Sequence, residues 1–451
     1  MQQPAQPAPS PKTESPAQSR RDLLKTSAAA VSAATLASLA FPSGVYAQVE
    51  GPLKVGLIGC GGRGSGAAIN ALNGDPSATL HAMGDMFMDK LETSLANLQK
   101  NEKAKQINVG DRKFAGFDAY KAVIAESDYV ILATPPHFRP MHLRAAIEAG
   151  KHVFCEKPVG VDVPGVKKVM EACKLAQEKK LSVISGLCYR YDPAKREVVK
   201  RIHDGQIGQI VSLQGMYNSG GLWVNPRKPE WSDMEWQLRN WLYFTWLSGD
   251  HIVEQHVHTL DKMLWLMKDV PPLKVTANGG RTQRTGQEYG HIFDHFDTVF
   301  EWEVEKRPVR AFCQTRQWVN TDTDVSDWAF GTEGVADVMG HRIEGKNEWR
   351  RKEAKENMYD VEHAEGIAAL RKGEPINNGD YMCKATLMGI MGRMAAYSGK
   401  TVYWDKAAAK KDRKANNPTV MDSKEDLSPP EYKMGPLPMP PVAVPGKTKI
   451  V

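Results

Sequence analysis

Three glycines early in the chain have the spacing of a phosphate-binding loop. Gly59, Gly61 and Gly64 follow the pattern G-x-G-x-x-G, after a short apolar run at residues 53–58 and before a helix-like segment (SGAAINAL). In a strand–loop–helix unit such glycines allow a tight turn, and the N–H groups at the helix start bind a pyrophosphate. The pattern predicts a dinucleotide site, whereas a plain glycine-rich turn is the alternative. The loop residues expected to contact the nucleotide are Gly59, Gly61, Gly62, Arg63 and Gly64.

An acidic residue follows at the distance typical of a ribose ligand. A second apolar segment, residues 79–84, ends in Asp85, which lies 21 residues beyond Gly64. A carboxylate at this position accepts hydrogen bonds from the adenosine ribose in NAD sites. It also repels the 2′-phosphate of NADP, and no arginine follows in residues 86–88. The sequence therefore predicts NAD as the cofactor, with NADP less favoured.

Three polar side chains in the second half of the chain are spaced for acid–base chemistry. Glu254, His258 and Asp261 stand at i, i+4 and i+7, which places them on one face of a continuous helix. There the carboxylate of Glu254 would orient the imidazole of His258 and raise its pKa, although a structural histidine is the alternative. His251 and His256 do not share that face and have no cysteine partner, so we expect no metal site.

The elements that must position these residues fall into two groups. Short apolar runs alternate with helical segments from 51 to about 185, which is typical of a doubly wound parallel sheet. Beyond about 190, longer segments at 210–217, 274–278, 296–303 and 309–314 are typical of antiparallel strands. We expect an α/β fold, with a Rossmann domain over 51–187 and an α+β substrate and oligomerisation domain over 188–405, built on a large open, mainly antiparallel sheet.

The bulk composition is that of a globular protein. The chain has 451 residues, of which 41% are hydrophobic and 25% charged, and a net charge of +6. Several basic residues lie in the tails, so we infer no nucleic-acid surface. The six cysteines lack C-x-x-C spacing, which argues against a zinc ribbon and a disulfide framework.

Both ends of the chain differ from the rest. Residues 1–18 are rich in Pro, Gln and Ser, and residues 19–25 (SRRDLLK) resemble a twin-arginine (Tat) signal with Leu23 in place of the usual Phe. The uncharged run that follows, about 16 residues, is short for a membrane span. We expect a disordered N-terminus and signal over 1–47, transient binding to the Tat translocase and a periplasmic location; an amphipathic helix is the alternative. The Lys- and Pro-rich tail, 406–451, is expected to be loose or to clamp a neighbouring subunit.

Four segments resemble the Gfo/Idh/MocA oxidoreductases, the family of glucose–fructose oxidoreductase and inositol dehydrogenase. They are residues 133–137 (ATPPH), 149–153 (AGKHV), 156–158 (EKP) and 188–193 (CYRYDP). The resemblance covers nearly the whole predicted mature chain. It implies cofactor contacts for Thr134, Pro135, His137, Glu156 and Lys157.

Residues 248–261 (SGDHIVEQHVHTLD) resemble the catalytic segment of that family, G-G-x-x-x-D-x-x-x-H-x-x-D. The resemblance implies that His258 is the catalytic histidine, with Glu254 in place of the first Asp and Asp250 in place of the second Gly. Oxidation of a secondary alcohol needs a base for the hydroxyl proton, a role that suits histidine. Lys157, at the carboxyl edge of the sheet, can stabilise the alkoxide or act as the base itself. The sequence leaves open which of the two takes the proton.

Five tryptophans crowd the stretch from 223 to 246, with arginine and asparagine among them. Aromatic rings stack on the C–H faces of sugars, although core packing is the alternative for at least half of these tryptophans. The substrate candidates are Arg190, Tyr191, Trp241 and Asp261.

Together these features predict an exported NAD-dependent oxidoreductase that acts on a secondary hydroxyl of a sugar, glycoside or cyclic polyol. Lys157, His258 and Glu254 are the expected catalytic residues, and export away from soluble NAD favours a tightly bound cofactor. Two alternatives stay open: NAD-dependent glycoside cleavage by transient oxidation at C3 and elimination, and a catalytically silent sugar- or nucleotide-binding protein. The family resemblance also implies a homodimer or homotetramer, packed through the open face of the second sheet.

Overall fold

A computed structural model describes residues 51–352, 356–412, 418–422 and 424–449. The predicted signal segment, residues 1–47, lies outside these ranges. No helix within them is long and apolar enough to cross a membrane.

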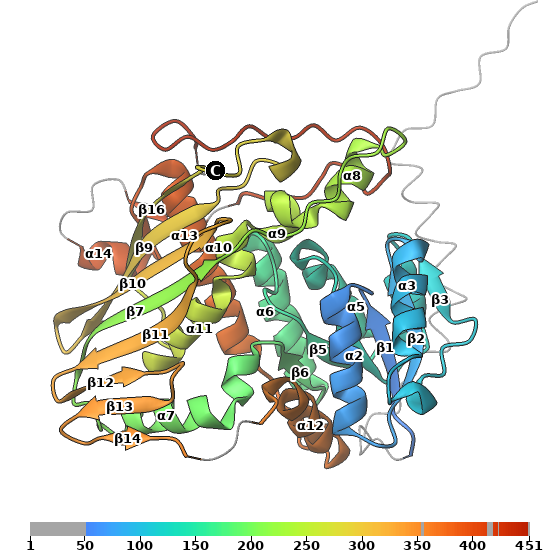
Figure 1. Ribbon diagram of the computed structural model, residues 1–451, viewed down its shortest axis with the longest axis horizontal. Helices are drawn as coiled ribbons and strands as arrows, with labels where there is room; N and C mark the ends of the chain where they lie inside the picture. The colour runs from blue at the N-terminus through green and yellow to red at the C-terminus, as the bar shows by residue number, and fades with distance from the viewer. Residues whose placement is uncertain (1–50, 353–355, 413–417, 423, 450–451) are drawn as a thin grey trace, which may run out of the picture. The chain divides into compact units, whose positions relative to one another are not determined.

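The first half of the described chain forms a six-stranded parallel sheet, seen at the right of Figure 1. The strand order is β3-β2-β1-β4-β5-β6. Its central strands are short and almost wholly apolar because helices cover both faces, as expected of a parallel sheet. The strands are β1 (Lys54–Ile58), β2 (Thr79–Asp85), β3 (Lys113–Ala115), β4 (Tyr129–Leu132), β5 (His152–Cys155) and β6 (Val183–Ser185). The helices in this part are α2 (Gly62–Gly74), α3 (Met88–Leu98), η1 (Ala104–Gln106), α4 (Ala119–Ala125), η2 (Pro136–Phe138), α5 (Arg139–Glu148) and α6 (Val163–Glu178).

The order of this sheet reverses at β1, which has β2 on one side and β4 on the other. In open α/β sheets such a reversal leaves a crevice at the carboxyl ends of the strands. The loops that leave β1, β2, β4 and β5 therefore meet at one edge.

The second sheet has ten strands within the described residues, in the order β14-β13-β12-β11-β7-β10-β9-β8-β15-β16. All neighbours pair antiparallel except β7 with β10 and β15 with β16. Its strands are β7 (Ile210–Ser219), β8 (Lys274–Gly280), β9 (His295–Val304), β10 (Arg307–Gln317), β11 (Asp324–Gly331), β12 (Gly334–Asp337), β13 (Arg342–Gly345), β14 (Trp349–Arg350), β15 (Val402–Tyr403) and β16 (Thr419–Val420).

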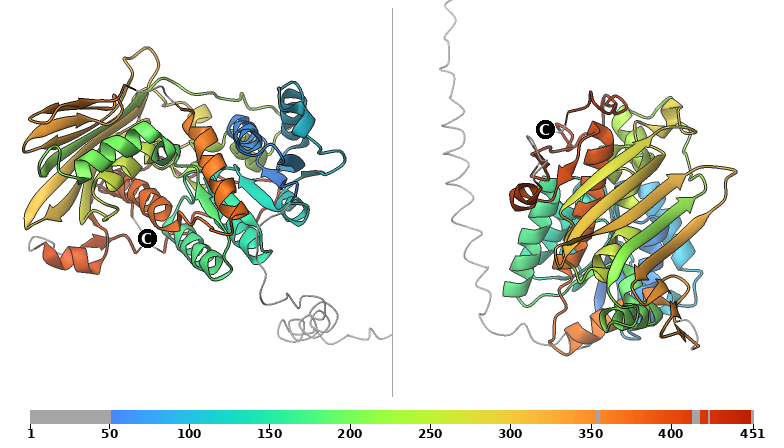
Figure 2. Two further views of the ribbon diagram at one scale, coloured as in Figure 1. Left: turned by 90° about the horizontal axis from the view of Figure 1, so that it is seen from below. Right: turned by 90° about the vertical axis from the view of Figure 1, so that its left-hand side faces the viewer.

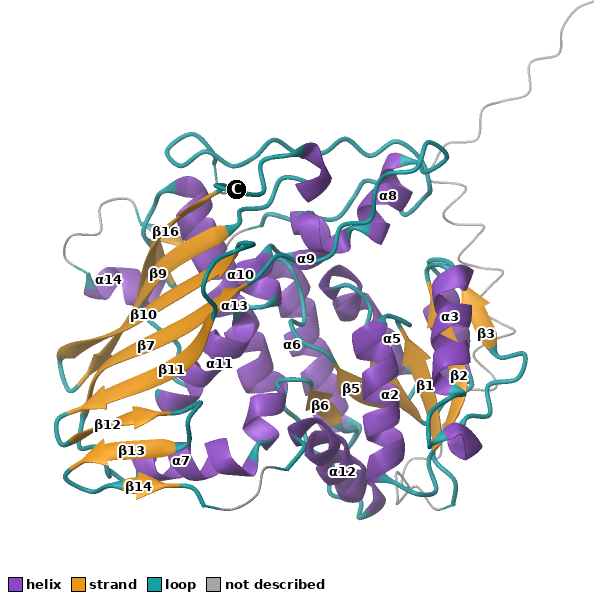
Figure 3. Ribbon diagram, viewed as in Figure 1, coloured by secondary structure: helices purple, strands orange, loops and turns teal. Residues whose placement is uncertain are grey.

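Buried and exposed residues alternate along β10, so one face of this sheet is packed and the other is open. Helices α11 (Val257–Leu266) and α13 (Gly379–Ser398) pack on the buried face, and Figure 3 shows them between the two sheets. The open face is turned toward the viewer in the right-hand view of Figure 2. The other helices of this part are η3 (Cys188–Tyr191), α7 (Pro193–His203), α8 (Asp233–Arg239), η4 (Trp241–Tyr243), α9 (Thr245–Ser248), α10 (His251–Glu254), η5 (Gln287–Tyr289), α12 (Met358–Arg371) and α14 (Lys406–Lys411).

The predicted fold class is confirmed: a Rossmann-type parallel sheet followed by a mainly antiparallel one. One late helix, α12, returns to pack against α2 beside the glycine loop. The expectation of a loose tail is wrong for the tail residues that the structure describes. They follow the chain's own surface, where Gly435 O accepts from Met234 N (3.1 Å) and Gly446 N donates to Ser398 O (2.9 Å).

Candidate functional site

A cavity of about 590 Å³ lies at the carboxyl ends of β1, β2, β4 and β5. Its far wall comes from the second half of the chain, where Trp223, Arg239, Trp241 and Glu254 line it. The two parts of the molecule therefore share one cleft. Of the residues predicted from the sequence, it is lined by Gly59, Gly61, Gly62, Arg63, Gly64, Asp85, Thr134, Pro135, Glu156, Lys157, Trp241 and Glu254.

The glycine loop has the shape that a pyrophosphate requires. Gly59 has a φ of +98°, and a Cβ there would lie 2.4 Å from Thr134 N. A Cβ on Gly64 would lie 1.9 Å from Gly59 O, so the helix packs on the loop at a distance that excludes a side chain. Within the described residues, Gly61 and Gly62 face open space and no side chain caps the start of α2. The loop thus offers N–H groups and room at a helix start, which fits a dinucleotide.

Asp85 ends β2 at the predicted position. Its Oδ2 accepts a hydrogen bond from Cys60 N (2.7 Å) and its Oδ1 from Phe87 N (3.0 Å). Burial raises the pKa of this carboxyl, and the two backbone donors oppose that rise. A carboxylate has about four acceptor positions, so the side chain fixes the loop and can still accept from ribose hydroxyls.

Lys157 follows β5 and points to Glu254. Its Nζ donates to Glu254 Oε1 (2.9 Å) and to Glu254 O (2.6 Å). Both side chains are largely buried, with exposed fractions of 14% and 18%. The pair joins the signature segment of the first sheet to the catalytic segment of the second part.

The prediction that Glu254 and His258 share one continuous helix is wrong. Helix α10 ends at Glu254 and α11 begins at Val257. Both Gln255 N (2.9 Å) and His256 N (3.0 Å) donate to His251 O, so the regular hydrogen-bond ladder is interrupted between the two helices. The interruption leaves Glu254 with Lys157 as its partner.

His258 is not among the cavity-lining residues. Its ring meets Tyr189 edge to face at 5.3 Å, and its buried Nδ1 has no hydrogen-bond partner within the described ranges. Burial lowers the pKa of His258 well below its ordinary value, and the charges of Lys157 and Lys262 lower it further. The predicted rise in this pKa is therefore wrong, because no carboxylate within the described residues offsets the effect of burial.

Glu156 and Arg63 connect the signature segment to the glycine loop. Arg63 Nε lies 3.0 Å from Glu156 Oε1, and its guanidinium lies 4.6 Å from the centre of the Tyr359 ring. Tyr359 comes from α12, so it is a neighbour that the sequence did not indicate. His137, in contrast, lies outside the cavity lining, with its Nε2 2.7 Å from Tyr432 Oη. Burial lowers the pKa of His137 to about 4.

Three of the four substrate candidates do not line the cavity. Arg190 Nε donates to Asp261 Oδ1 (2.9 Å), and Arg190 Nη2 donates to Asp269 Oδ1 (2.7 Å). Tyr191 donates to Asn378 Oδ1 (2.8 Å) and is buried against the core of the first sheet. Buried charges need partners, and Arg190 and Asp261 satisfy each other. Of these candidates, Trp241 alone is in the cavity lining.

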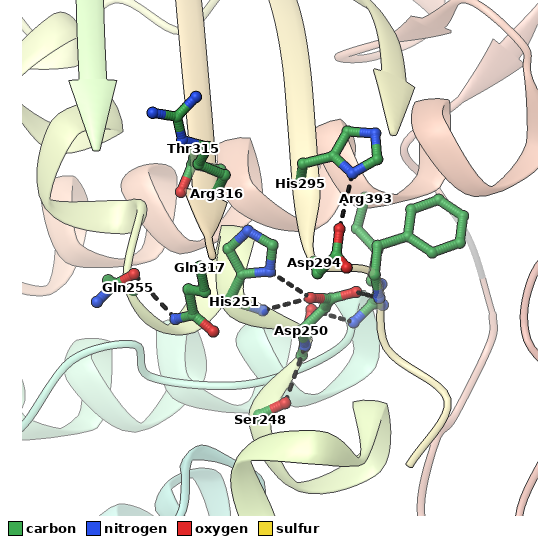
Figure 4. A network of polar contacts seen from close by, with 12 residues as sticks. Ser248, Asp250, His251, Gln255, Asp294, His295, Thr315, Arg316, Gln317 and Arg393 are labelled. Carbon is green, nitrogen blue, oxygen red and sulfur yellow. Dashed lines mark hydrogen bonds and ion pairs between the residues drawn. The ribbon is translucent and has the colours of Figure 1, made fainter. Parts of the chain in front are cut away.

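The start of α10 is fixed by a buried polar network, shown in Figure 4. Asp250 has a φ of +71°, and its Oδ2 accepts from Phe293 N (2.8 Å) and Tyr397 Oη (2.6 Å). His251 Nδ1 lies 3.0 Å from Asp250 Oδ1. Asp250 thus holds the backbone that a glycine holds in the related pattern. The network fixes α10 and so fixes Glu254 at its end.

Residues 53–186 match the GFO_IDH_MocA family, an oxidoreductase family with an NAD-binding Rossmann fold. Inositol 2-dehydrogenase 3 of Saccharopolyspora erythraea is 30% identical over 41% of this chain and 47% of its own length. Levoglucosan dehydrogenase of Pseudarthrobacter phenanthrenivorans is 28% identical over 42% of this chain and 46% of its own length. The chain thus spans less than half the length of either curated relative. The matched residues comprise the first sheet with its helices, so this part of the chain is similar to the NAD-binding Rossmann fold of that family.

The likeness to solved structures extends over both parts. GenD2 from gentamicin A biosynthesis, solved in complex with NAD, is similar over 80% of this chain and 98% of its own, with a TM-score of 0.60 and 17% identity. A myo-inositol dehydrogenase from Sinorhizobium meliloti is similar over 78% and 99%, with a TM-score of 0.56 and 20% identity. At this identity the likeness concerns the fold.

Proposed function

We propose that the protein is an exported, NAD-dependent oxidoreductase that acts on a secondary hydroxyl of a sugar, glycoside or cyclic polyol. The observation that carries this proposal is that the glycine loop, Asp85 and the Lys157–Glu254 pair line a single cavity. Relatives named as inositol and levoglucosan dehydrogenases support the substrate class.

Different residues of the cavity would bind different parts of the cofactor. Gly61, Gly62 and the start of α2 would hold the pyrophosphate, and Asp85 the adenosine ribose. Thr134 and Glu156 would face the nicotinamide ribose. When bound, the cofactor supplies a nicotinamide ring that accepts or donates a hydride.

Lys157 and His258 are the residues that would handle the hydroxyl proton of the substrate. The ammonium of Lys157, held by two oxygens of Glu254, would stabilise negative charge on the substrate oxygen. Its lowered pKa favours the neutral imidazole of His258 but also weakens that ring as a base, and His258 does not line the cavity. We therefore assign the electrostatic role to Lys157 and keep both residues as candidates for the base.

Export and cofactor retention belong to the same proposal. The twin-arginine-like segment at residues 19–25 supports export. An enzyme outside the cytoplasm has no supply of soluble NAD, so we propose that it keeps its nucleotide. It would then oxidise one substrate and reduce another on the same cofactor.

The decisive experiment is to denature the purified mature protein and identify any released nucleotide by mass and absorbance. Near-stoichiometric NAD(H) is the expected result, followed by turnover with pairs of sugar or polyol donors and acceptors. A protein that neither carries nor binds NAD would overturn the proposal and favour a silent binding protein.

A second candidate is NAD-dependent cleavage of a glycoside. A glycosyl hydrolase family 109 protein of Shewanella amazonensis is 27% identical over 44% of this chain and 45% of its own length, and it favours this alternative. Release of the aglycone from a nitrophenyl glycoside, with no net change in bound NADH, would identify it.

We also propose that the protein forms a homodimer or homotetramer through the open face of the second sheet. Phe312 on β10 is 51% exposed there and pairs across the strands with Val299. A single isolated phenylalanine would carry little weight, but here it lies at the centre of a ten-stranded face. Light scattering of wild type and Phe312→Glu should show a smaller assembly for the variant.

A further inference from the structure

An arginine from the second half of the chain reaches across the cavity to the first sheet's helices. Arg239 ends α8, and its Nη1 donates to Asp89 Oδ2 (3.0 Å) in the first turn of α3. The same guanidinium lies 3.8 Å from the centre of the Phe87 ring. These contacts join residues about 150 positions apart in the sequence.

The contact lies at the end of the cavity that Asp85 occupies. Phe87 and Arg239 line the same cavity as Asp85, and Phe87 N is a donor to the Asp85 carboxylate. Lys90 also lines this end. In the proposed function this end receives the adenosine, so Arg239 and Phe87 form its outer wall.

Arg239 is held at this position from its own helix as well. Its Nε donates to Glu235 Oε1 (2.9 Å), and the side chain of Arg239 is only 13% exposed, whereas that of Asp89 is 62% exposed. Two carboxylates therefore share one cation that is mostly withdrawn from water. The charge is engaged by protein groups and not left for a phosphate.

Helix α8 is tied down on its other side by the C-terminal tail. Gln237 Nε2 donates to Leu437 O (2.7 Å), and Leu437 N donates to Asp233 Oδ2 (3.2 Å). The tail runs along α8 at the top of Figure 1. The helix is thus fixed to the second part of the molecule, and Arg239 extends from it onto α3.

We propose that Arg239 is a positioning residue that closes the adenosine end of the cavity, and that its ion pair with Asp89 must open before the nucleotide leaves. The inference rests on the proposed cofactor site and explains how the protein retains its nucleotide. We call the Arg239–Asp89 ion pair the latch. Asp89 is its exposed residue, and the guanidinium of Arg239 packs on the ring of Phe87.

The test is the dissociation rate of NADH from the mature full-length protein, followed by fluorescence after mixing with excess NAD. We expect Arg239→Ala to accelerate release at least tenfold and Asp89→Asn about threefold. Arg227→Ala is the matched control, because Arg227 pairs with Asp233 (2.7 Å) and stacks on Trp236 within the same segment without reaching α3. It should change the rate less than twofold.

Salt gives an independent reading of the same contact. An ion pair with an exposed carboxylate is screened by salt, so wild-type release should accelerate as ionic strength rises. Arg239→Ala should lose most of that dependence. Thermal melting of each variant establishes that the fold is kept, and Asp89→Asn alters an exposed side chain that folding tolerates.

Unchanged release rates in Arg239→Ala and Asp89→Asn would contradict the proposed latch without affecting the proposed cofactor site. Equal acceleration by Arg227→Ala and Arg239→Ala would also overturn it, since the effect would then come from loosening α8. A wild-type protein that binds no NADH would overturn the proposed function and the latch together.

Discussion

Two glutamates near the cavity show how differently the same side chain is used. Glu254, at the end of α10, faces Lys157 at 2.9 Å and keeps some contact with water. Glu362, in α12, is fully buried, and neither of its carboxylate oxygens has a hydrogen-bond partner within the described residues. A buried carboxylate without a partner keeps its proton, whereas one paired with an ammonium stays charged. Burial and pairing together, and not residue type, decide which glutamate can take part in chemistry.

The charged groups around Glu362 also favour its protonated form. Burial raises the pKa of Glu362 well above its ordinary value, and the nearby carboxylate of Glu156 raises it further. The charge of Arg63 opposes the rise but is engaged by Glu156 itself. Burial without a partner therefore favours the protonated form of Glu362, whereas Glu254 has an ammonium partner.

Removing the ammonium of Lys157 should have the largest effect of the variants that test the contrast between Glu254 and Glu362. Lys157→Ala leaves Glu254 without its partner and takes away the charge that stabilises the substrate oxygen. Turnover should fall by about 10²–10³-fold, as for other losses of transition-state charge stabilisation. NADH binding, measured by fluorescence titration, should stay within a few fold of wild type. Unchanged turnover would remove Lys157 from the proposed mechanism.

Neutralising the anion tests the other half of the pair. Glu254→Gln keeps the size of the side chain and a hydrogen bond to Lys157 but loses the charge. A charge-assisted hydrogen bond of about 1.5–3 kcal/mol corresponds to a loss of roughly 10- to 100-fold in kcat. Glu362→Gln is the contrasting variant, and its kcat should stay within twofold of wild type. Equal losses in both variants would contradict the distinction between the two glutamates.

Asp85 is an intermediate case: two backbone N–H groups donate to its carboxylate, and no cation among the described residues forms an ion pair with it. If the donors keep it charged, Asp85→Asn removes the repulsion of a 2′-phosphate without changing shape. The dissociation constant of NADP relative to NAD should then fall about tenfold, since close like charges cost one to several kcal/mol. Isothermal titration with both nucleotides measures the ratio. A ratio that does not move would place Asp85 with Glu362 as a neutral acid.

The sequence predicted the parts of this site that depend on local structure. Gly59, Gly61 and Gly64 follow one strand and open one helix, so their spacing is sufficient to define the loop. Lys157 could be placed as well, because its position after a strand sets the edge of the sheet that it occupies.

The sequence could not predict the partners that tertiary structure chooses. The spacing of Glu254 and His258 would place them on one face of a continuous helix, but the helix is interrupted after Glu254. Glu254 therefore pairs with Lys157 and not with His258. Arg190 and Asp261 carry charges that suited a substrate site, yet they neutralise each other in the interior. The five tryptophans indicated the correct region, but only the fold shows that Trp223 and Trp241 line the cavity while Trp246 lies in the core.

The smallest predicted effect is on stability, and it follows from the raised pKa of Glu362. In the unfolded chain this glutamate loses its proton near its ordinary pKa, whereas in the folded protein it keeps the proton to a higher pH. Above the unfolded pKa the folded state therefore binds the extra proton, and its stability falls as the pH rises. Glu362→Gln cannot titrate, so the difference between its free energy of unfolding and that of wild type should grow as the pH rises above the unfolded-state pKa of Glu362.

Denaturant unfolding of the two proteins at pH 5, 6 and 7 measures this gain. Glu365→Gln is the matched control on the same helix, because Glu365 is only partly buried and is paired with Arg196 at 2.6 Å. Its difference from wild type should stay nearly constant over this range. A constant difference for Glu362→Gln as well would mean that Glu362 is ionised in the folded protein. A charged Glu362 would need a counter-ion or a water molecule where α12 packs. The two glutamates would then carry the same charge and differ only in their partners.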